Sequence, residues 1–372
     1  MCEFESKNKD IYGADWINAQ KFGFVGDGET PNDEVFARYI AECPETTLYF
    51  GPGIYCFEKT VNFPREMFVE MDAKAELKCI AREPLEYFVT LRLGDESWGP
   101  FEAYALRSYI KGGIINANFC AKVALGVHGA LHTHFRDFMI RDVLEKGIVT
   151  QTSKLHDGCA YFDNIYFYNS KPIKGTVAMY DNTADNAFNM CTAVNFETGI
   201  CTGGGKFTNC SCWFNALGKS LIPTSVFARM EGGSQAVFIN PMVDTYRTGF
   251  RLVRSASGNY PRVAISNLVW ITNDVFYTRG QWSADDNLQK DFPMQIFDVE
   301  SDECRIELTG MNIPWREWGF SFSNIPLPSS TFMNVRFEQG WDPWNDMKNF
   351  RDDTYLIKKL LGNLHDFGDR QP

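Results

Sequence analysis

The chain has 372 residues, 44% of them apolar, and carries 47 Asp and Glu against 36 Lys and Arg, for a net charge of −11. This acidic balance excludes non-specific binding to nucleic acid or to an anionic membrane, which needs a basic surface, although it allows a local basic pocket for an acidic sugar. The apolar content can bury a large core, and no stretch reaches the roughly 20 apolar residues that span a bilayer, so we expect a globular protein of one or two domains.

The first residues and the cysteines bear on the compartment. The opening MCEFESKNKD contains no apolar run, so no signal peptide is visible. The 11 cysteines are odd in number and scattered, which favours reduced, buried thiols over a disulfide framework. We therefore expect a cytoplasmic protein, and removal of a signal ahead of this sequence is the alternative.

The segment KFGFVGDGETPNDEVFARYIAEC, residues 21–43, raises the question of a phosphate site because it places glycines before a helix-like stretch. Thr30 can cap that helix, with Pro31 in its first turn and Asp33 in the position of a capping-box acid. An apolar stripe follows at Val35, Phe36, Tyr39 and Ile40. Neither nucleotide-binding glycine pattern is present, so the glycines are interpreted as turn residues.

The next residues, TTLYFGPGIYCF, predict two short strands around a Gly-Pro-Gly turn. Together with the preceding segment they resemble the N-terminal signature of the pectate-lyase-like superfamily, although Pro52 and Gly53 lack the residue that the family places between them, and Asn32-Asp33 replaces its Asp pair. The resemblance implies an all-β, single-stranded right-handed parallel β-helix with an N-terminal capping helix. Its members include lyases, hydrolases, sugar transferases, epimerases and phage tailspikes.

An irregular repeat supports a solenoid, because one unit of strand, turn residue and strand recurs along the chain. Asn and Gly tolerate the left-handed conformation, so they are favoured at a stacked turn. We place the turn at Gly113, Asp137, Asn164, Ala193, Asn209, Asn240, Asn267, Gly310 and Asn334. Most steps between these positions span 24–31 residues, but one spans 16, which indicates a short coil or a misplaced position at Ala193, and one spans 43.

We therefore expect one β-helix domain over residues 1–372, with an N-terminal cap at 1–60, coils at 105–340 and a tail helix within 341–372. The long step contains TRGQWSADDNLQKDFP, which predicts a surface loop. The tail sequence DDTYLIKKLLGNL has a cap, an apolar stripe and a terminal glycine, which together predict the helix. This helix would cover the last coil or contact a neighbouring subunit.

Carboxylates that project from successive coils can approach within the distances that glycoside chemistry requires. Asp181 and Asp185 lie in AMYDNTADNAFN, which resembles a motif of sugar-processing members of the superfamily, and we predict a catalytic role for both. The alternative is that they form Asx-turns, since Asp and Asn bond their own backbone in turns. Glu231, before a Gly-Gly turn, and Asp244, after a strand, are further catalytic candidates that could equally be solvated loop acids.

Several other residues are candidates for contacting a sugar. An acidic sugar could be neutralised by Arg136, Arg247 and Arg251, each of which could instead pair with local acids. Trp282 and Asp285 in the predicted loop could contact substrate, with an ordinary polar loop as the alternative. His134, which shares a strand face with His132, is a further binding candidate, and we expect no metal because a sufficient ligand set is missing.

These residues favour a carbohydrate-active enzyme that cleaves or transfers a glycosidic bond of an oligosaccharide through two carboxylates and without a cofactor, as a glycoside hydrolase or a fructotransferase-like enzyme. A polysaccharide lyase that acts on a uronate-containing glycan is the first alternative. A non-catalytic, tailspike-like glycan-binding protein is the second. The resemblance also implies a homotrimer, sometimes with the site between subunits.

Overall fold

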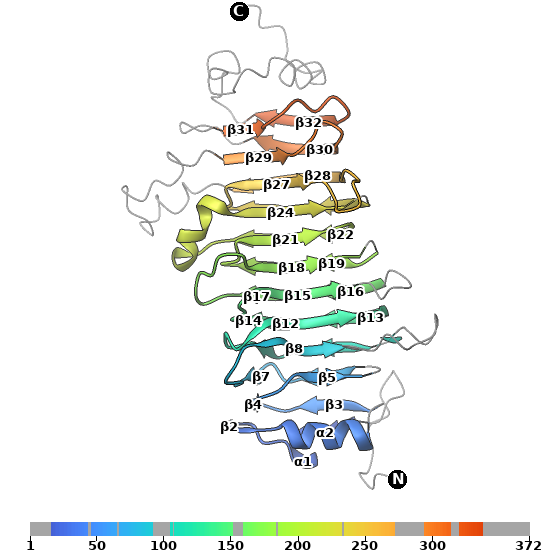
Figure 1. Ribbon diagram of the computed structural model, residues 1–372, viewed down its shortest axis with the longest axis vertical. Helices are drawn as coiled ribbons and strands as arrows, with labels where there is room; N and C mark the ends of the chain where they lie inside the picture. Colours follow the sequence, from blue (N-terminus) through green and yellow to red (C-terminus); the bar gives the residue numbers. More distant parts are fainter. Residues whose placement is uncertain are drawn as a thin grey trace, which may run out of the picture.

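The computed structural model describes residues 16–43, 46–64, 67–91, 105–106, 108–151, 159–183, 185–232, 234–271, 294–313 and 320–337. These residues form a parallel β-helix, in which the chain winds upward and adds one strand to each of three sheets in successive coils (Figure 1). Every strand pairing between described residues is parallel. The predicted all-β solenoid is confirmed.

Two of the sheets, here sheets A and B, are joined along one corner. Sheet A contains β1 (Trp16–Asn18), β3 (Thr47–Phe50), β6 (Phe68–Met71), β9 (Ala105–Leu106), β10 (Tyr109–Lys111), β13 (Ala130–Arg136), β16 (Cys159–Asp163), β19 (Ala187–Asn189), β22 (Gly205–Thr208) and β25 (Gln235–Ile239). Sheet B contains β2 (Asp27–Pro31), β4 (Gly53–Phe57), β7 (Ala75–Cys79), β11 (Ile114–Asn116), β14 (Met139–Arg141), β17 (Tyr166–Tyr168), β20 (Thr192–Val194), β23 (Ser211–Trp213) and β26 (Met242–Asp244). Three long strands, β28 (Arg262–Ile271), β30 (Arg305–Ile313) and β32 (Thr331–Phe337), continue the joined sheet, and β28 pairs with strands of both.

Sheet C is a separate ten-stranded sheet. Its strands are β5 (Val61–Phe63), β8 (Leu85–Leu91), β12 (Ala121–His128), β15 (Lys146–Gln151), β18 (Val177–Asp181), β21 (Thr198–Thr202), β24 (Val226–Glu231), β27 (Thr248–Val253), β29 (Met294–Val299) and β31 (Phe320–Ser323). Three described elements lie outside the strand pattern of the coils, and one of them is α2 (Asp33–Glu42), between β2 and β3. The 3₁₀ helix η1 (Ala216–Thr224) interrupts one coil between β23 and β24, and α1 (Ala19–Phe22) follows β1.

The interior is filled by side chains that repeat from coil to coil. On sheet A, Phe135, Phe162, Phe188, Phe207 and Phe238 form a stack with ring centroids 4.4–5.1 Å apart and interplanar angles of 9–15°. This separation matches the strand spacing of a sheet, so each ring occupies the same register in its coil. All five rings are almost completely buried.

The corner between sheets A and B is the predicted stacked turn. Eight of the nine predicted anchors are Asn, Asp or Gly residues with positive φ. The amides bond along the axis, as Asn164 Nδ2 donates to Asp137 Oδ1 at 2.9 Å and Asn240 Nδ2 donates to Asn209 Oδ1 at 2.9 Å.

The anchor at Ala193 is wrong. Ala193 is fully buried in the centre of β20, and the turn residue of that coil is Met190, with φ of 51°. Met190 N donates to Thr208 O at 2.9 Å, so the hydrogen bonding of the adjacent coil holds this methionine in the left-handed region. The coil that follows is therefore short, with 19 residues between Met190 and Asn209.

The N-terminal helix lies across the first coils (Figure 1) but starts later than predicted. Helix α2 (Asp33–Glu42) follows Asn32, which makes no side-chain cap. Thr30 instead donates its backbone N–H and hydroxyl to the Asp27 carboxylate, and these bonds lower the pKa of Asp27 to about 2. The signature glycines serve backbone packing, because a Cβ on Gly53 would lie 2.8 Å from Gly26 O.

Coils begin before residue 105, since β1, β3 and β6 already pair in register. The predicted loop after β28 and the predicted tail helix lie outside the described residues, as do Trp282 and Asp285. Among the described helices, none is long and apolar enough to cross a membrane.

Candidate functional site

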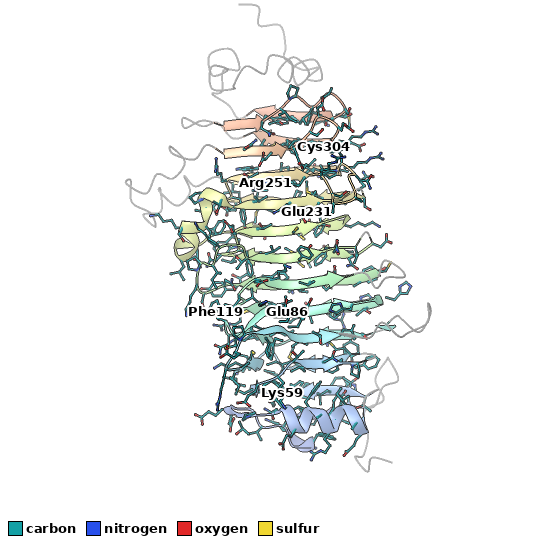
Figure 2. The ribbon with its side chains drawn as sticks, viewed as in Figure 1. Lys59, Glu86, Phe119, Glu231, Arg251 and Cys304 are labelled. Carbon is teal, nitrogen blue, oxygen red and sulfur yellow. The ribbon has the colours of Figure 1, made fainter. Side chains whose placement is uncertain are left out.

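A polar cavity of about 760 Å³ lies on the outer face of sheet C. Its wall is built by the ends of β18, β24 and β27 and by the corner turns that follow them. The side chains that bring chemistry to it are Tyr180, Asn182, Arg229, Glu231, Arg254 and Ser255. Figure 2 shows Glu231 and Arg251 on neighbouring strands, β24 and β27, in the C-terminal part of the solenoid.

Strand register explains why these residues gather. Tyr180 pairs with Cys201, Cys201 with Arg229, and Arg229 with Arg251, so one outer column of sheet C passes along the cavity. Residues in register on adjacent parallel strands lie about 4.8 Å apart, so this column is a continuous surface. Burial is the largest cause that raises the pKa of Tyr180, and Lys146 Nζ lies 4.4 Å from the centre of its ring.

Glu231 is the one carboxylate of the described residues that lines the cavity. Its Oε1 lies 2.5 Å from Arg229 Nε, and its side chain is 33% exposed. A Cβ on the following Gly232 would lie 2.9 Å from Gly203 backbone atoms, so glycine is required for the two turns to pack. Glu231 is therefore held by its neighbour and remains open to a ligand.

Two further arginines belong to this part of sheet C: Arg254 lines the cavity, and Arg251 lies beside it on β27. Arg251 Nε lies 2.7 Å from Asp298 Oδ2. Because β27 pairs with β24, the predicted Arg251 lies beside the strand of Glu231. Arg254 stacks over Tyr260 at 5.3 Å and donates from Nε to Gly258 O at 3.0 Å. The loop after β27 is thereby fixed, and it carries the serines that close one side of the cavity.

Asp181 is brought close to the cavity but points into the protein. It is 1% exposed and accepts hydrogen bonds from Thr150 Oγ1 at 2.6 Å, Asn186 Nδ2 at 2.8 Å and Thr183 Oγ1 at 2.9 Å. Burial raises the pKa of Asp181. These contacts fix the corner turn that presents Asn182, so the geometry gives Asp181 a positioning function. Asp185, in the same turn, is exposed, and its catalytic role stays a prediction.

Asp244 is placed on a different sheet from Glu231, at the end of β26 in sheet B. Its Oδ1 is buried and has no hydrogen-bond partner among the described residues, and burial raises the pKa of Asp244 to about 7. Nearby, Arg247 donates from Nη1 to Pro223 O at 2.8 Å. The fold therefore does not bring Asp244 and Glu231 together as a pair.

His134 and Arg136 lie on a third surface, the outer face of sheet A, where the His134 ring stacks on Tyr161. His132 has positive φ at a β-bulge and so departs from the regular alternation that the prediction assumed. Among the described residues, no group of three metal-binding side chains occurs. Trp282 and Asp285 lie outside the described residues, so their predicted contacts stay predictions.

Sequence reasoning missed Tyr180, Arg229 and Arg254. Arg229 and Glu231 are two residues apart on one strand, and this alternation was the available signal that both face outward. The participation of Tyr180 depends on register across two coils, which the repeat alone did not give.

The chain is thus a parallel β-helix protein with a polar cavity on one sheet. A tailspike of Acinetobacter phage vb_AbaP_AS12 aligns with 87% of this chain and 57% of its own, at 11% identity and a TM-score of 0.56. The N-terminal fragment of the bacteriophage Phi29 gene product 12 aligns with 86% of this chain and 62% of its own, at 10% identity and 0.56. A family 28 exopolygalacturonase of Yersinia enterocolitica aligns with 89% of this chain and 77% of its own, at 11% identity and 0.55.

No protein-family profile and no curated protein matches the sequence. Identities of 10 and 11% show a shared fold and no more. What the chain shares with these structures is the parallel β-helix fold, which the sequence predicts.

Proposed function

We propose that the protein is a carbohydrate-active enzyme that cleaves or transfers a glycosidic bond in the cavity on sheet C. The observation that carries this proposal is Glu231, a partly exposed carboxylate held by Arg229 in a polar cavity large enough for sugar residues. Hydroxyl, amide and guanidinium groups around it match the hydrogen-bonding groups of a glycan. The Yersinia neighbour is an exopolygalacturonase, which agrees with this proposal by analogy of fold.

Glu231 serves in this proposal as one of the two carboxylates of a glycosidase. Asp185 is the partner that the sequence favours, because its turn follows β18, two strands from β24. Two strand spacings correspond to about 10 Å, close to the separation of roughly 6.5–9.5 Å in enzymes that invert the anomeric carbon. One carboxyl group would protonate the leaving oxygen, and the other would activate water on the opposite face of the sugar.

A specific observation favours elimination as the second candidate reaction. Tyr180 lies beside Lys146 and in the column of Arg229, and these are the groups that a lyase needs to remove a proton and to neutralise a uronate. Tyr180, as its phenolate, would take the proton from the carbon next to the carboxylate. A double bond would form between that carbon and its neighbour while the bond from the neighbour to the glycosidic oxygen breaks, and this oxygen would leave as a hydroxyl after taking up a proton. The substrate would then be an acidic glycan, in agreement with the cationic rim.

The test is mass analysis of products after incubation of the protein with neutral and uronate-containing oligosaccharides. Gain of one water per cleavage supports hydrolysis, transfer products of unchanged total composition support transglycosylation, and an unsaturated product that absorbs in the ultraviolet supports elimination. Binding of glycans without any product would reject the enzyme and support the tailspike-like alternative. A loss of turnover of about 1,000-fold in Glu231→Gln, with substrate binding retained, ties the reaction to this cavity.

We also propose the homotrimer that the resemblance implies and the cytoplasmic location that the sequence favours. Light scattering after gel filtration tests the trimer, which would have three times the 42.4 kDa of one chain. Cell fractionation tests the location.

A further inference from the structure

The outer face of sheet A carries an aromatic strip that the cavity on sheet C does not use. Phe68, Tyr109, His134 and Tyr161 occupy one register position in four consecutive coils. Their strand neighbours Val69, Ile110, Phe135 and Phe162 point inward and are buried. The strip therefore faces outward, with side chains that range from half-buried to exposed.

The rings of the aromatic strip are ordered by their contacts with one another. His134 and Tyr161 are stacked, with centroids 4.8 Å apart and an interplanar angle of 13°. Phe68 and Tyr109 lie 5.7 Å apart, and the Tyr109 hydroxyl lies 2.8 Å from Thr47 Oγ1. Ring contacts of this kind hold the side chains in place before any ligand arrives, which lowers the entropic cost of binding.

The charges beside the aromatic strip balance. The adjoining outward column carries Glu70, Lys111, Arg136 and Asp163, two acids and two bases in consecutive coils. Lys111 Nζ lies 2.8 Å from Glu70 Oε1, and Asp163 Oδ1 accepts a hydrogen bond from Asn189 Nδ2 at 3.2 Å. A surface without net charge does not favour a phosphate-rich or anionic partner, in contrast to the arginine-lined cavity on sheet C.

We propose that the aromatic strip is a second glycan-binding site, which holds a run of neutral sugar residues against the outer face of sheet A. The apolar C–H faces of sugar rings pack on the aromatic rings, and the flanking polar groups accept and donate hydrogen bonds to the hydroxyls. This inference rests on the proposed function in naming a glycan as the ligand. It assigns the predicted binding residues His134 and Arg136 to this face and separates them from the cavity.

The experiment is native electrophoresis in gels that contain hydroxyethylcellulose, xylan or galactomannan, with polygalacturonate as an acidic comparison. The wild-type chain is expected to be retarded by at least one of the neutral polysaccharides. The double variant His134→Ala/Tyr161→Ala is expected to bind that polysaccharide about 100-fold more weakly, or about tenfold per ring. Tyr161→Phe keeps the ring face and is expected to retain binding.

Tyr168→Ala is the matched control, because Tyr168 is a partly buried tyrosine on the neighbouring sheet B. The proposal is overturned if no neutral polysaccharide retards the wild-type chain, or if the double variant is retarded as strongly as the wild type. It is also overturned if the double variant changes the assembled mass, since the strip would then be a contact between copies.

Failure of the proposed function is distinguishable from failure of this inference. Glu231→Gln should lose turnover of short oligosaccharides and keep retardation, whereas the double variant should keep turnover and lose retardation. Absence of turnover in every protein, with retardation intact, would reject the proposed enzyme and leave the strip supported.

Discussion

Sheet C and sheet A are built by the same coils and the same phenylalanine interior, yet their outer faces differ. On sheet C, register aligns Tyr180 with Arg229 and Arg251 beside a cavity that contains Glu231. On sheet A, register aligns rings with balanced charges beside them. Stacked coils thus place the side chains of equivalent positions in one column. One face can therefore collect reactive groups while another face collects aromatic rings.

The two faces also differ in what surrounds them. The turns that follow β18, β21, β24 and β27 line the cavity at the edge of sheet C. Asp181 fixes one of these turns by its hydrogen bonds from three side chains. The aromatic strip of sheet A lies on the strands themselves and takes one residue from each of four neighbouring strands. We therefore associate the turns beside sheet C with the proposed reaction, and the flat strands of sheet A with the proposed binding of a glycan chain.

The largest predicted effect is a loss of enzymatic activity when the cavity on sheet C is altered. Glu231→Gln should lower kcat by about 1,000-fold, because a positioned acid or base contributes roughly 10²–10⁴ to the rate. Steady-state kinetics on the oligosaccharide that gives products would measure this change. Glu86→Gln is the control, since Glu86 is an exposed acid of the same sheet, 2.8 Å from Lys122. Equal activity of Glu231→Gln and the wild type would remove the cavity from the mechanism.

The second prediction concerns the interior that both faces share. Phe207 lies between Phe188 and Phe238 at centroid distances of 5.1 and 4.9 Å and is fully buried. Phe207→Ala should lower the free energy of unfolding by about 4 kcal/mol, through lost burial and the cavity left behind. Urea unfolding would measure it, and Met190→Ala at an exposed turn is the comparison. A decrease of less than about 1 kcal/mol in the free energy of unfolding would mean that the phenylalanine stack contributes little to the stability of the coils.

The third prediction concerns Asp244 on sheet B, the sheet on which we propose neither the reaction nor the second glycan-binding site. Burial raises the pKa of Asp244 to about 7, so the folded chain holds a proton that the unfolded chain, with a pKa near 4, releases. Stability from this group therefore falls as pH rises from about 4 to 7 and stays low above 7. Asp244→Asn should raise the free energy of unfolding at pH 8 by about 2 kcal/mol, given the partial exposure, and leave it nearly unchanged at pH 4. Thermal unfolding at both pH values tests this, and an equal shift at both would contradict it.

The smallest effect tests the ion pairs of the two faces. Arg251–Asp298 on sheet C and Lys111–Glu70 on sheet A are both partly exposed, at N–O distances of 2.7 and 2.8 Å. Asp298→Asn and Glu70→Gln should each change the free energy of unfolding by less than about 1 kcal/mol, and salt should reduce the difference. Unfolding at low and high salt measures both. A larger loss for either would identify a pair that the fold requires.

The turn chemistry made the solenoid predictable from the sequence. Asn164, Asn209, Asn240 and Asn267 take the left-handed conformation at one corner, as their residue type indicated. Met190 takes the same conformation without that preference, because the stacked coils on both sides impose it. Propensity therefore located most coils and misplaced one, where tertiary packing overrode it.

The candidate site was less predictable, because a sequence does not state which of three faces a residue joins. Glu231 was found from its strand end and Gly-Gly turn, and the structure places it in the cavity. Asp244 had a similar local pattern but belongs to sheet B. Coil lengths vary from 19 residues, at the step after Met190, to 43, so a one-strand error in counting moves a carboxylate to another face.

The amide ladder at the corner of sheets A and B has a consequence for growth of the molecule. Asn240 Nδ2 donates to Asn209, and Asn267 Nδ2 donates to Asn240 at 3.0 Å, so each rung needs only the rung beside it. A duplicated coil would insert one rung, one interior ring and one residue of each outer column at once, and lengthen the molecule by about 4.8 Å. A fractional coil would break all of these rows together. Coils are therefore gained or lost as whole units. A binding surface becomes longer or shorter with the number of coils, while the contacts within each coil stay the same.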